Sequence, residues 1–128
     1  MSLRQAVATE KAPKAIGPYS QGVRAGSLLF VSGQVPIDPA TGALIEGDIA
    51  AQTHRVMRNL AAILEAGGAT MDHVVRCTVY LADMNDFAAM NEVYGSYFAQ
   101  PAPARATIQA VRLPKDARIE IDVIAVTG

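Results

Sequence analysis

Apolar residues gather in short runs rich in β-branched side chains, the pattern typical of buried strands. The clearest runs are LLFVSGQV at residues 28–35 and VVRCTVYL at residues 74–81. Two further extended runs lie within residues 101–126 and are joined by the turn sequence LPKD. Alternation along the second run predicts one shared face for Val75, Cys77 and Val79.

Helical periodicity appears in two places. Apolar residues recur at spacings of three and four over residues 49–66, after a potential N-cap at Asp48 and before a Gly-Gly pair at 67–68. A second helix is predicted from about residue 86 to residue 98. Between the first strand and the first helix, IDPATGAL places Pro39 and Gly42 for a tight turn.

This order of elements predicts an α+β fold in a single domain spanning residues 1–128. We expect one mixed β-sheet with two helices packed on one face. The other face of the sheet would then be uncovered, although its strands are apolar. Self-association of the chain is the natural way to cover such a face.

Composition narrows the function classes. The formal net charge is −1, so the chain has no general positive field for nucleic acid or an anionic membrane surface. A single cysteine, Cys77, rules out an internal disulfide and fits a reducing compartment. No run of apolar residues has the length of a signal peptide or a membrane span. These features predict a cytoplasmic protein with no membrane partner.

Charged residues on the last two strands are the first candidates for chemistry. Alternation places Arg105, Thr107 and Gln109 on one face of their strand. On the last strand Glu120 and Asp122 share a face, roughly 7 Å apart. One interpretation is structural: the acids are solvated or pair with Arg112 and Arg118. The other is a cleft where an arginine grips a carboxylate and an acid handles a water.

Four further polar or glycine positions are ambiguous from pattern alone. Tyr19 lies in the loop IGPYSQG, and a tyrosine in such a loop is more often a packing residue than a catalytic one. Ser32-Gly33 lies at the end of a strand, and its simpler interpretation is a turn. Asn91 lies on an apolar helix stripe with Phe87 and Tyr94, so it needs a hydrogen-bond partner, and a structural bond to backbone is the simpler interpretation. A ligand-facing role is the alternative for each.

Other chemistries find little support in the sequence. His54 and His73 have no Cys or His at metal-ligand spacing, so no metal site is predicted. Cys77 reads as a small buried hydrophobe and not as a nucleophile. The sequence has neither a phosphate-binding glycine loop with its lysine nor a GxSxG nucleophile elbow.

Five segments together resemble the RidA/YjgF family of reactive intermediate deaminases. They are AIGPYSQG, FVSGQVPIDPATG, MNDFAAMNEVY, PARAT and LPKDARIEIDVIAV, in order over about residues 7–126. The resemblance implies a chorismate-mutase-like fold and a homotrimer with active sites between subunits. It also implies hydrolysis of 2-enamine and 2-imino acids, such as 2-aminoacrylate, 2-iminopropanoate and 2-iminobutanoate, to 2-oxo acids and ammonia, without a cofactor.

The resemblance also implies residue roles. Arg105 would bind the substrate carboxylate and Glu120 would position or deprotonate the attacking water. Tyr19, Ser32 and Asn91 would line the pocket, with Gly33 as an adjacent backbone contact and Tyr19 or Asn91 orienting the imine nitrogen. Thr107 stands where the best-known members often have cysteine, and its backbone N–H would preserve the contact with substrate. The short loop between residues 98 and 103 is expected to shape the rim of the cleft.

Three alternative functions stay open at this stage. One is an endoribonuclease or translation inhibitor, which the neutral charge and the missing basic, aromatic groove disfavour. The second is a protein that binds small 2-oxo acids without catalysis. The third is a more specialised deaminase, such as one acting on 2-aminomuconate.

Overall fold

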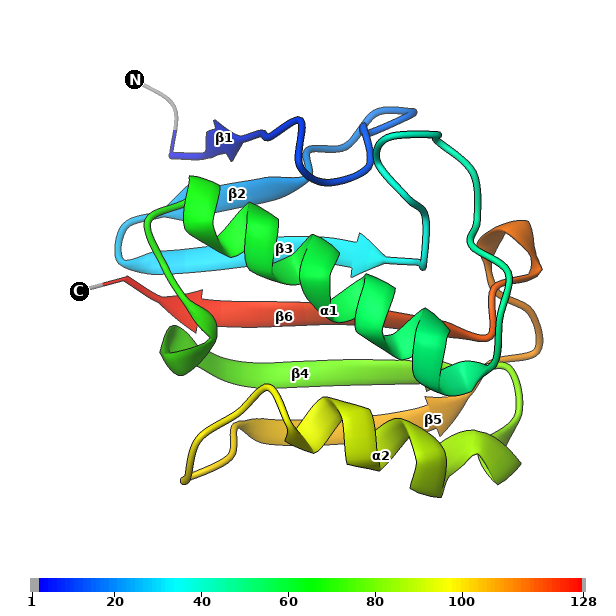
Figure 1. Cartoon of the computed structure of the whole chain (residues 1–128). Helices are drawn as coiled ribbons and strands as arrows, with labels where there is room; N and C mark the ends of the chain where they lie inside the picture. Colours follow the sequence, from blue (N-terminus) through cyan, green and yellow to red (C-terminus); the bar gives the residue numbers. More distant parts are fainter. Residues whose placement is uncertain (1–2, 128) are drawn as a thin grey trace.

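The computed structural model of the chain describes residues 3–127 and shows one six-stranded sheet with two helices on one face (Figure 1). The strand order is β1-β2-β3-β6-β4-β5, and only the β4–β5 pairing is parallel among these strands. The elements are β1 (Gln5–Val7), β2 (Gly22–Ala25), β3 (Leu28–Gln34), α1 (Ile49–Ala66), β4 (Val74–Leu81), α2 (Phe87–Gly95), β5 (Ala104–Gln109) and β6 (Ile119–Val126). The predicted α+β fold is confirmed. The short strands β1 and β2 were not predicted.

The long helix α1 follows its sequence signals closely. The Asp48 carboxylate accepts a hydrogen bond from the backbone N–H of Ala51 at 2.9 Å, as an N-cap residue should. At the other end, Gly67 lies against the core: a Cβ there would come within 2.6 Å of Cδ2 of Leu29. The predicted limits of this helix are therefore confirmed, and Gly67 is also required for close packing of the helix end on β3.

A β-bulge corrects the predicted face of β4. The register of β4 against β6 shifts between Val74 and Arg76, so Val74 is buried while the side chain of Val75 is 47% exposed. Cys77 and Val79 are fully buried, as expected. A bulge adds one residue to a strand and so inverts the alternation before it. The predicted place of Val75 beside Cys77 was wrong for this reason.

The second helix is shorter than predicted. It ends at Gly95, and the N–H groups of residues 96–98 bond to carbonyls three residues back, which makes a tighter turn and not an α-helix. A glycine favours such an end because it weakens helix propagation. The ring of Phe98 still packs on Tyr94, with centroids 4.9 Å apart.

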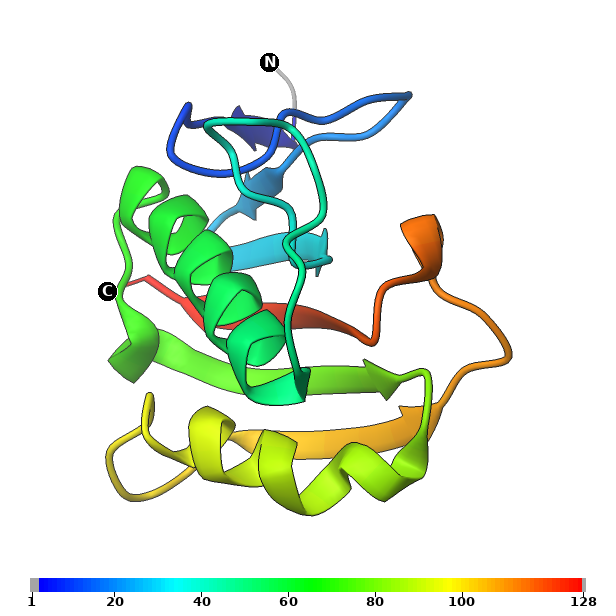
Figure 2. The same ribbon diagram turned by 45° about the vertical axis from the view of Figure 1, so that its right-hand side comes forward.

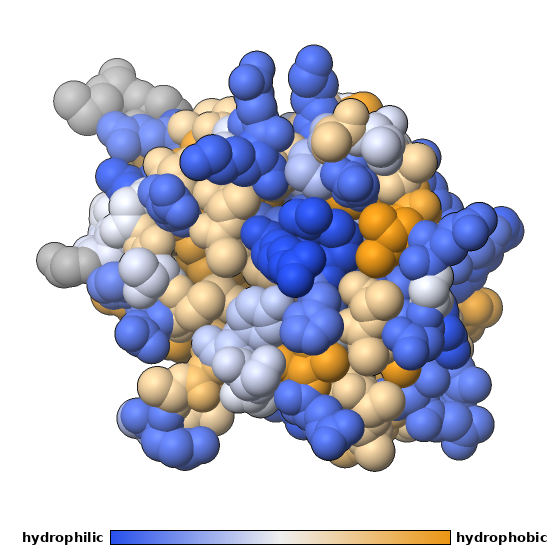
Figure 3. Space-filling model, in the orientation of Figure 1, coloured by the Kyte–Doolittle hydropathy of each residue, from blue (hydrophilic) through white to orange (hydrophobic). Residues whose placement is uncertain are grey.

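Helices cover only one face of the sheet (Figures 1 and 2). Seen from that side, hydrophilic residues gather at the centre over α1, and strongly hydrophobic colour forms only small separate areas (Figure 3). On the opposite face, Leu28 pairs with Val126 and Phe30 pairs with Ile124 across β3 and β6. Leu28, Phe30 and Val126 are all exposed in the single chain. The predicted uncovered apolar face is present.

Three buried amides tie loops to this core. Gln21 bonds to the backbone of Thr9, Ala12 and Pro13, so it fixes the loop that precedes β2. Asn59 of α1 donates to the carbonyl of Ile37 at 2.9 Å, and Gln52 accepts from the N–H of Arg118. Buried amides need such partners.

Among residues 3–127, no helix has the length and hydropathy to cross a membrane.

Replacing Asp48 with alanine tests the cap of α1. The variant should lose about 0.5–2 kcal/mol of the free energy of unfolding, because the N–H of Ala51 loses its acceptor. Asp48→Ser, which retains a capping oxygen, is the matched control and should lose less. Urea denaturation of both variants at equal protein concentration measures the difference. Equal losses would show that the cap does not stabilise the helix.

Candidate active site in two parts

Glu120 and the end of β3 form the first part of the site. Ser32 and Gly33 lie in a bulge where β3 changes register against β6. The side chain of Glu120 lies directly over Gly33, so a Cβ added there would come within 2.9 Å of its carboxyl carbon. Glycine is therefore needed at this position to admit the acid. The structure brings Ser32, Gly33 and Glu120 together.

The loop that carries Tyr19 is fastened to the same bulge. The Ser32 hydroxyl donates to the carbonyl of Ser20 at 2.6 Å, and the Ser32 N–H donates to the carbonyl of Gln21. Tyr19 is half exposed and its backbone N–H bonds to the carbonyl of Gly17. The hydroxyl proton of Ser32 therefore holds the loop, and its oxygen can only accept a bond from a ligand.

A cleft of about 850 Å³ opens over this first part. Gly33, Glu120 and Tyr19 are among the residues that line it. Lys14 and Lys115 also line it, which gives the cleft two cationic side chains beside one acid. The site residues that share this cleft are Tyr19, Ser32, Gly33 and Glu120.

Glu120 is half-buried beside a second acid. Burial first, and then the negative charge of Asp122, raise the pKa of Glu120 above its ordinary value of 4.5. Asp122 accepts a hydrogen bond from the hydroxyl of Tyr80 at 3.2 Å. Tyr80 is the cross-strand neighbour of Glu120 on β4. A carboxylate with a raised pKa is a better proton acceptor near neutral pH than an ordinary glutamate.

Arg105 forms the second part of the site with α2. Its Nη1 donates to Oδ1 of Asn91 at 2.7 Å. Its guanidinium carbon lies 4.9 Å from the ring centroid of Tyr94 and 5.5 Å from that of Phe87. Asn91 therefore bonds to a side chain, and not to backbone as its structural interpretation required. Thr107 follows on the same face of β5, with a buried hydroxyl oxygen that has no partner within residues 3–127.

The two parts face opposite sides of the sheet. Arg105 is in register with Cys77, which points toward the helices, whereas Glu120 is in register with Tyr80 on the open face. Arg105 and Glu120 lie two strands apart and are offset by three residues along the strand direction. Strand geometry then puts their Cα atoms roughly 14 Å apart. One chain does not bring these two residues together.

The predicted pairing of Glu120 and Asp122 with Arg112 and Arg118 was wrong. Arg112 pairs with Asp116 at 2.7 Å, and Arg118 pairs with Asp86 at 3.5 Å. These are the two ion pairs formed within residues 3–127, so Arg105, Glu120 and Asp122 lie outside them. Asp122 and Arg105 are instead held by hydrogen bonds with Tyr80 and Asn91.

The histidines and the cysteine have structural surroundings. Nδ1 of His54 bonds to the hydroxyl of Tyr97 at 2.9 Å, and His73 completes a capping box with Thr70. Burial raises the pKa of the Cys77 thiol, which is the opposite of what activates a nucleophile. Across the described residues no three potential metal ligands come together.

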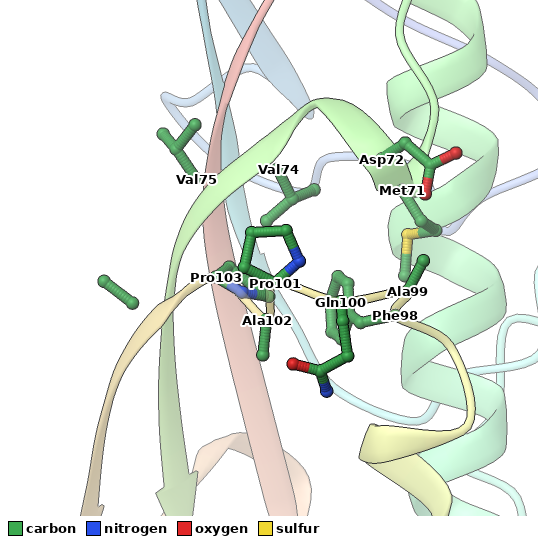
Figure 4. Close-up of a pocket in the computed structure, with 11 residues that line it drawn as sticks. Met71, Asp72, Val74, Val75, Phe98, Ala99, Gln100, Pro101, Ala102 and Pro103 are labelled. Atoms are coloured by element: carbon green, nitrogen blue, oxygen red, sulfur yellow. The ribbon is translucent and has the colours of Figure 1, made fainter.

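A second cleft of about 550 Å³ lies at the other end of β4 (Figure 4). It lies between the segment from Met71 to Val75 and the loop at residues 98–104. None of the predicted site residues lines it. The loop at residues 98–103 thus lines this second cleft, and it is not among the residues that line the cleft above Glu120.

The sequence interpretation missed several neighbours of the site. Tyr80 could have been found, because alternation in the run at 74–81 places its side chain on the face of the strand away from Cys77 and Val79. Phe87 and Tyr94 were identified only as an apolar stripe, and no local signal shows that Arg105 lies against them. The amides of Gln21 and Asn59, which hold the loops around the cleft, gave no signal of their own.

Comparison with known proteins shows the family. The family described as Endoribonuclease L-PSP matches residues 9–127, which is nearly the whole chain. The chain belongs to this family, which is the YjgF/RidA family. The resemblance found in the sequence motifs is confirmed.

Individual relatives match nearly the whole chain. A RutC family protein of Pyrococcus horikoshii is 54% identical over 123 residues, which are 96% of this chain and 98% of that protein. The mouse protein named 2-iminobutanoate/2-iminopropanoate deaminase is 46% identical over 126 residues, 98% and 93% of the two chains. The crystal structure of Escherichia coli TdcF with bound serine has a TM-score of 0.92 at 42% identity, covering 97% and 99%.

The raised pKa of Glu120 predicts a pH-dependent stability. The folded state holds the proton more tightly than the unfolded state, so stability falls as pH rises from 4.5 through the folded pKa. Glu120→Gln should therefore have a higher free energy of unfolding than wild type at pH 7, and this advantage should shrink toward pH 4.

Urea denaturation of both proteins at several pH values, at one protein concentration, measures this effect. Asp122→Asn serves as a control that removes only the neighbouring charge, and it should shift the pH dependence of wild type partway toward that of Glu120→Gln. An advantage of Glu120→Gln that is the same at pH 4 and pH 7 would contradict the raised pKa.

Proposed function

We propose that this protein hydrolyses 2-imino acids, and their 2-enamine tautomers, to 2-oxo acids and ammonia. The observation that carries the proposal is the state of Arg105: a half-buried guanidinium outside the ion pairs of the described residues, held by an amide and two aromatic rings. Such a fork is suited to bidentate binding of a carboxylate. The name of the mouse relative supports imino acids as the substrate class.

Each residue then has a defined task. Arg105 binds the substrate carboxylate, and Glu120 accepts a proton from water as the water oxygen bonds to C2 of the imine. Glu120 passes that proton to the nitrogen, and the second proton of the water follows as the C–N bond breaks. The nitrogen then leaves as ammonia, and the water oxygen remains as the C2 carbonyl. Tyr19 orients the substrate in the cleft that it lines together with Ser32 and Gly33.

The proposed site is completed by a second copy of the chain. Arg105 and Glu120 face opposite sides of one sheet, so Arg105 of one chain must meet Glu120 of another. The exposed apolar residues Leu28, Phe30 and Val126 offer the surface on which copies can associate. We propose that this head-to-tail contact closes into a ring of three chains, a homotrimer.

Rival activities are separated by simple measurements. The family description supports testing ribonuclease activity, but the net charge of −1 gives no field for RNA. RNA cleavage that persists in an Arg105 variant of proven purity would favour the ribonuclease. Saturable binding of a 2-oxo acid without faster imine loss would favour a binding protein. Turnover of 2-aminomuconate in preference to 2-iminobutanoate would favour the specialised deaminase.

Arg105→Lys tests the carboxylate anchor. Lysine keeps the charge but cannot present two parallel N–H donors, so the loss of one charge-assisted bond should cost roughly 1.5–3 kcal/mol of substrate binding. Turnover should fall as well, because the substrate loses its fixed angle to the water. A threonine dehydratase supplies 2-iminobutanoate, and its disappearance is followed in the presence of each variant. Near-normal activity would refute the anchoring role, provided that the variant is stable and its assembly in solution has the same mass as that of wild type.

Mixed assemblies test whether the site is shared between chains. Arg105→Ala and Glu120→Gln should each be nearly inactive alone. If they are unfolded together and refolded as mixtures, random assembly should restore about one quarter of the sites, because some contacts then pair an intact arginine with an intact glutamate. Imine hydrolysis and native mass measurement check this. Mixed assemblies that stay as inactive as the parents would refute the shared site.

A further inference from the structure

Three side chains of α2 surround the guanidinium of Arg105. Phe87, Asn91 and Tyr94 recur at spacings of four and three, so they lie on one face of the helix. Asn91 accepts the hydrogen bond from Nη1, while the rings of Tyr94 and Phe87 lie within 6 Å of the guanidinium carbon. We call these three residues the neutral clamp.

The clamp holds a cation without neutralising it. An amide oxygen and two aromatic rings attract a guanidinium but carry no net charge. The same chain shows the other outcome elsewhere: Arg112 and Arg118 lie beside aspartates and form ion pairs. Asparagine and aspartate have nearly the same shape, so a carboxylate at position 91 would fit the same contact. The choice of an amide at this position leaves the charge of Arg105 available.

The hydrogen bond also leaves donors available. A guanidinium has five N–H groups in a planar fork, and Asn91 is bonded through Nη1. The donors on Nε and Nη2 form another edge of the fork, which can meet both oxygens of one carboxylate. Contact with the rings restricts rotation of the guanidinium plane, so this edge has a fixed direction.

We propose that the neutral clamp positions Arg105 and keeps its charge free for the substrate carboxylate, and that Asn91 acts through Arg105 and not as a substrate ligand. This inference rests on the proposed function for the identity of the anion. The coupling between Asn91 and Arg105 stands on the structure alone. Phe87, Asn91 and Tyr94 are therefore positioning residues.

A double-mutant cycle tests the coupling without any ligand. Asn91→Asp should be as stable as wild type or more stable, because the new carboxylate pairs with Arg105. In an Arg105→Met background the same change should lower stability, because the carboxylate has lost its cation. Asn85→Asp, at an exposed position six residues earlier, adds the same charge outside the clamp. Its effect on stability should be the same in both backgrounds. Equal effects of Asn91→Asp in the two backgrounds would overturn the clamp.

Binding of 2-oxobutanoate, a stable product, then tests the consequence. Asn91→Asp should bind it about tenfold or more weakly than wild type, since an internal carboxylate competes for Arg105, whereas Asn85→Asp should match wild type. Asn91→Ala adds no charge, so its affinity should lie between those of wild type and Asn91→Asp. It also serves if the aspartate variant does not fold, and an affinity equal to that of wild type would then overturn the proposal.

Two results separate the clamp from the proposed function. Wild-type protein that neither binds 2-oxobutanoate nor hydrolyses imines would refute the proposed function, while the stability cycle still decides the coupling. If the wild-type protein hydrolyses imines and Asn91→Asp binds 2-oxobutanoate as tightly as wild type, the clamp alone is refuted. An Asn91→Ala variant that binds more weakly than Asn91→Asp would make the amide a direct ligand, which also refutes the clamp.

Discussion

The alternation of β6 is the constraint on which the rest of this structure depends. This central strand turns Ile119, Ile121 and Val123 toward the helices, and all three are almost fully buried. The intervening Glu120 and Asp122 must then point to the other face of the sheet. A hydrophobic core on one side thus forces two acids onto the side that no helix covers, where the single chain gives them no cationic partner within residues 3–127.

Local features of the fold bring backbone and a loop against Glu120 on that face. The bulge at Ser32 and Gly33 lets the side chain of Glu120 lie against backbone, and a side chain at Gly33 would displace it. The Ser32 hydroxyl ties the Tyr19 loop to the same place, and the buried amide of Gln21 fixes the preceding loop. Burial of the acid is the main cause of its raised pKa.

The edge strand β5 serves the opposite face. It pairs in parallel with β4, so Arg105 lies beside Cys77 under α2, where aromatic rings and an amide hold it. Burying a cation is costly unless it is paired or bonded, and here neutral groups provide the contacts. Each chain therefore carries the guanidinium of Arg105 on one face of its sheet and the carboxylate of Glu120 on the other. The site proposed above needs both groups, so it would be completed by a second chain.

The sequence by itself determined those features that depend on near neighbours: the limits of α1 with its cap at Asp48, the main strands, the uncovered apolar face and the family. It also identified Arg105, Glu120, Tyr19, Ser32, Gly33 and Asn91 as candidates. Only the tertiary structure decided which of them meet. The bulges at Val75 and at Ser32-Gly33 exist because β3 and β4 pair with β6 in a particular register. The contact of Arg105 with α2, and its separation from Glu120, follow from the strand order. Periodicity is a local property of a chain, whereas register and strand order are set by pairing between distant segments, and no short stretch of sequence encodes them.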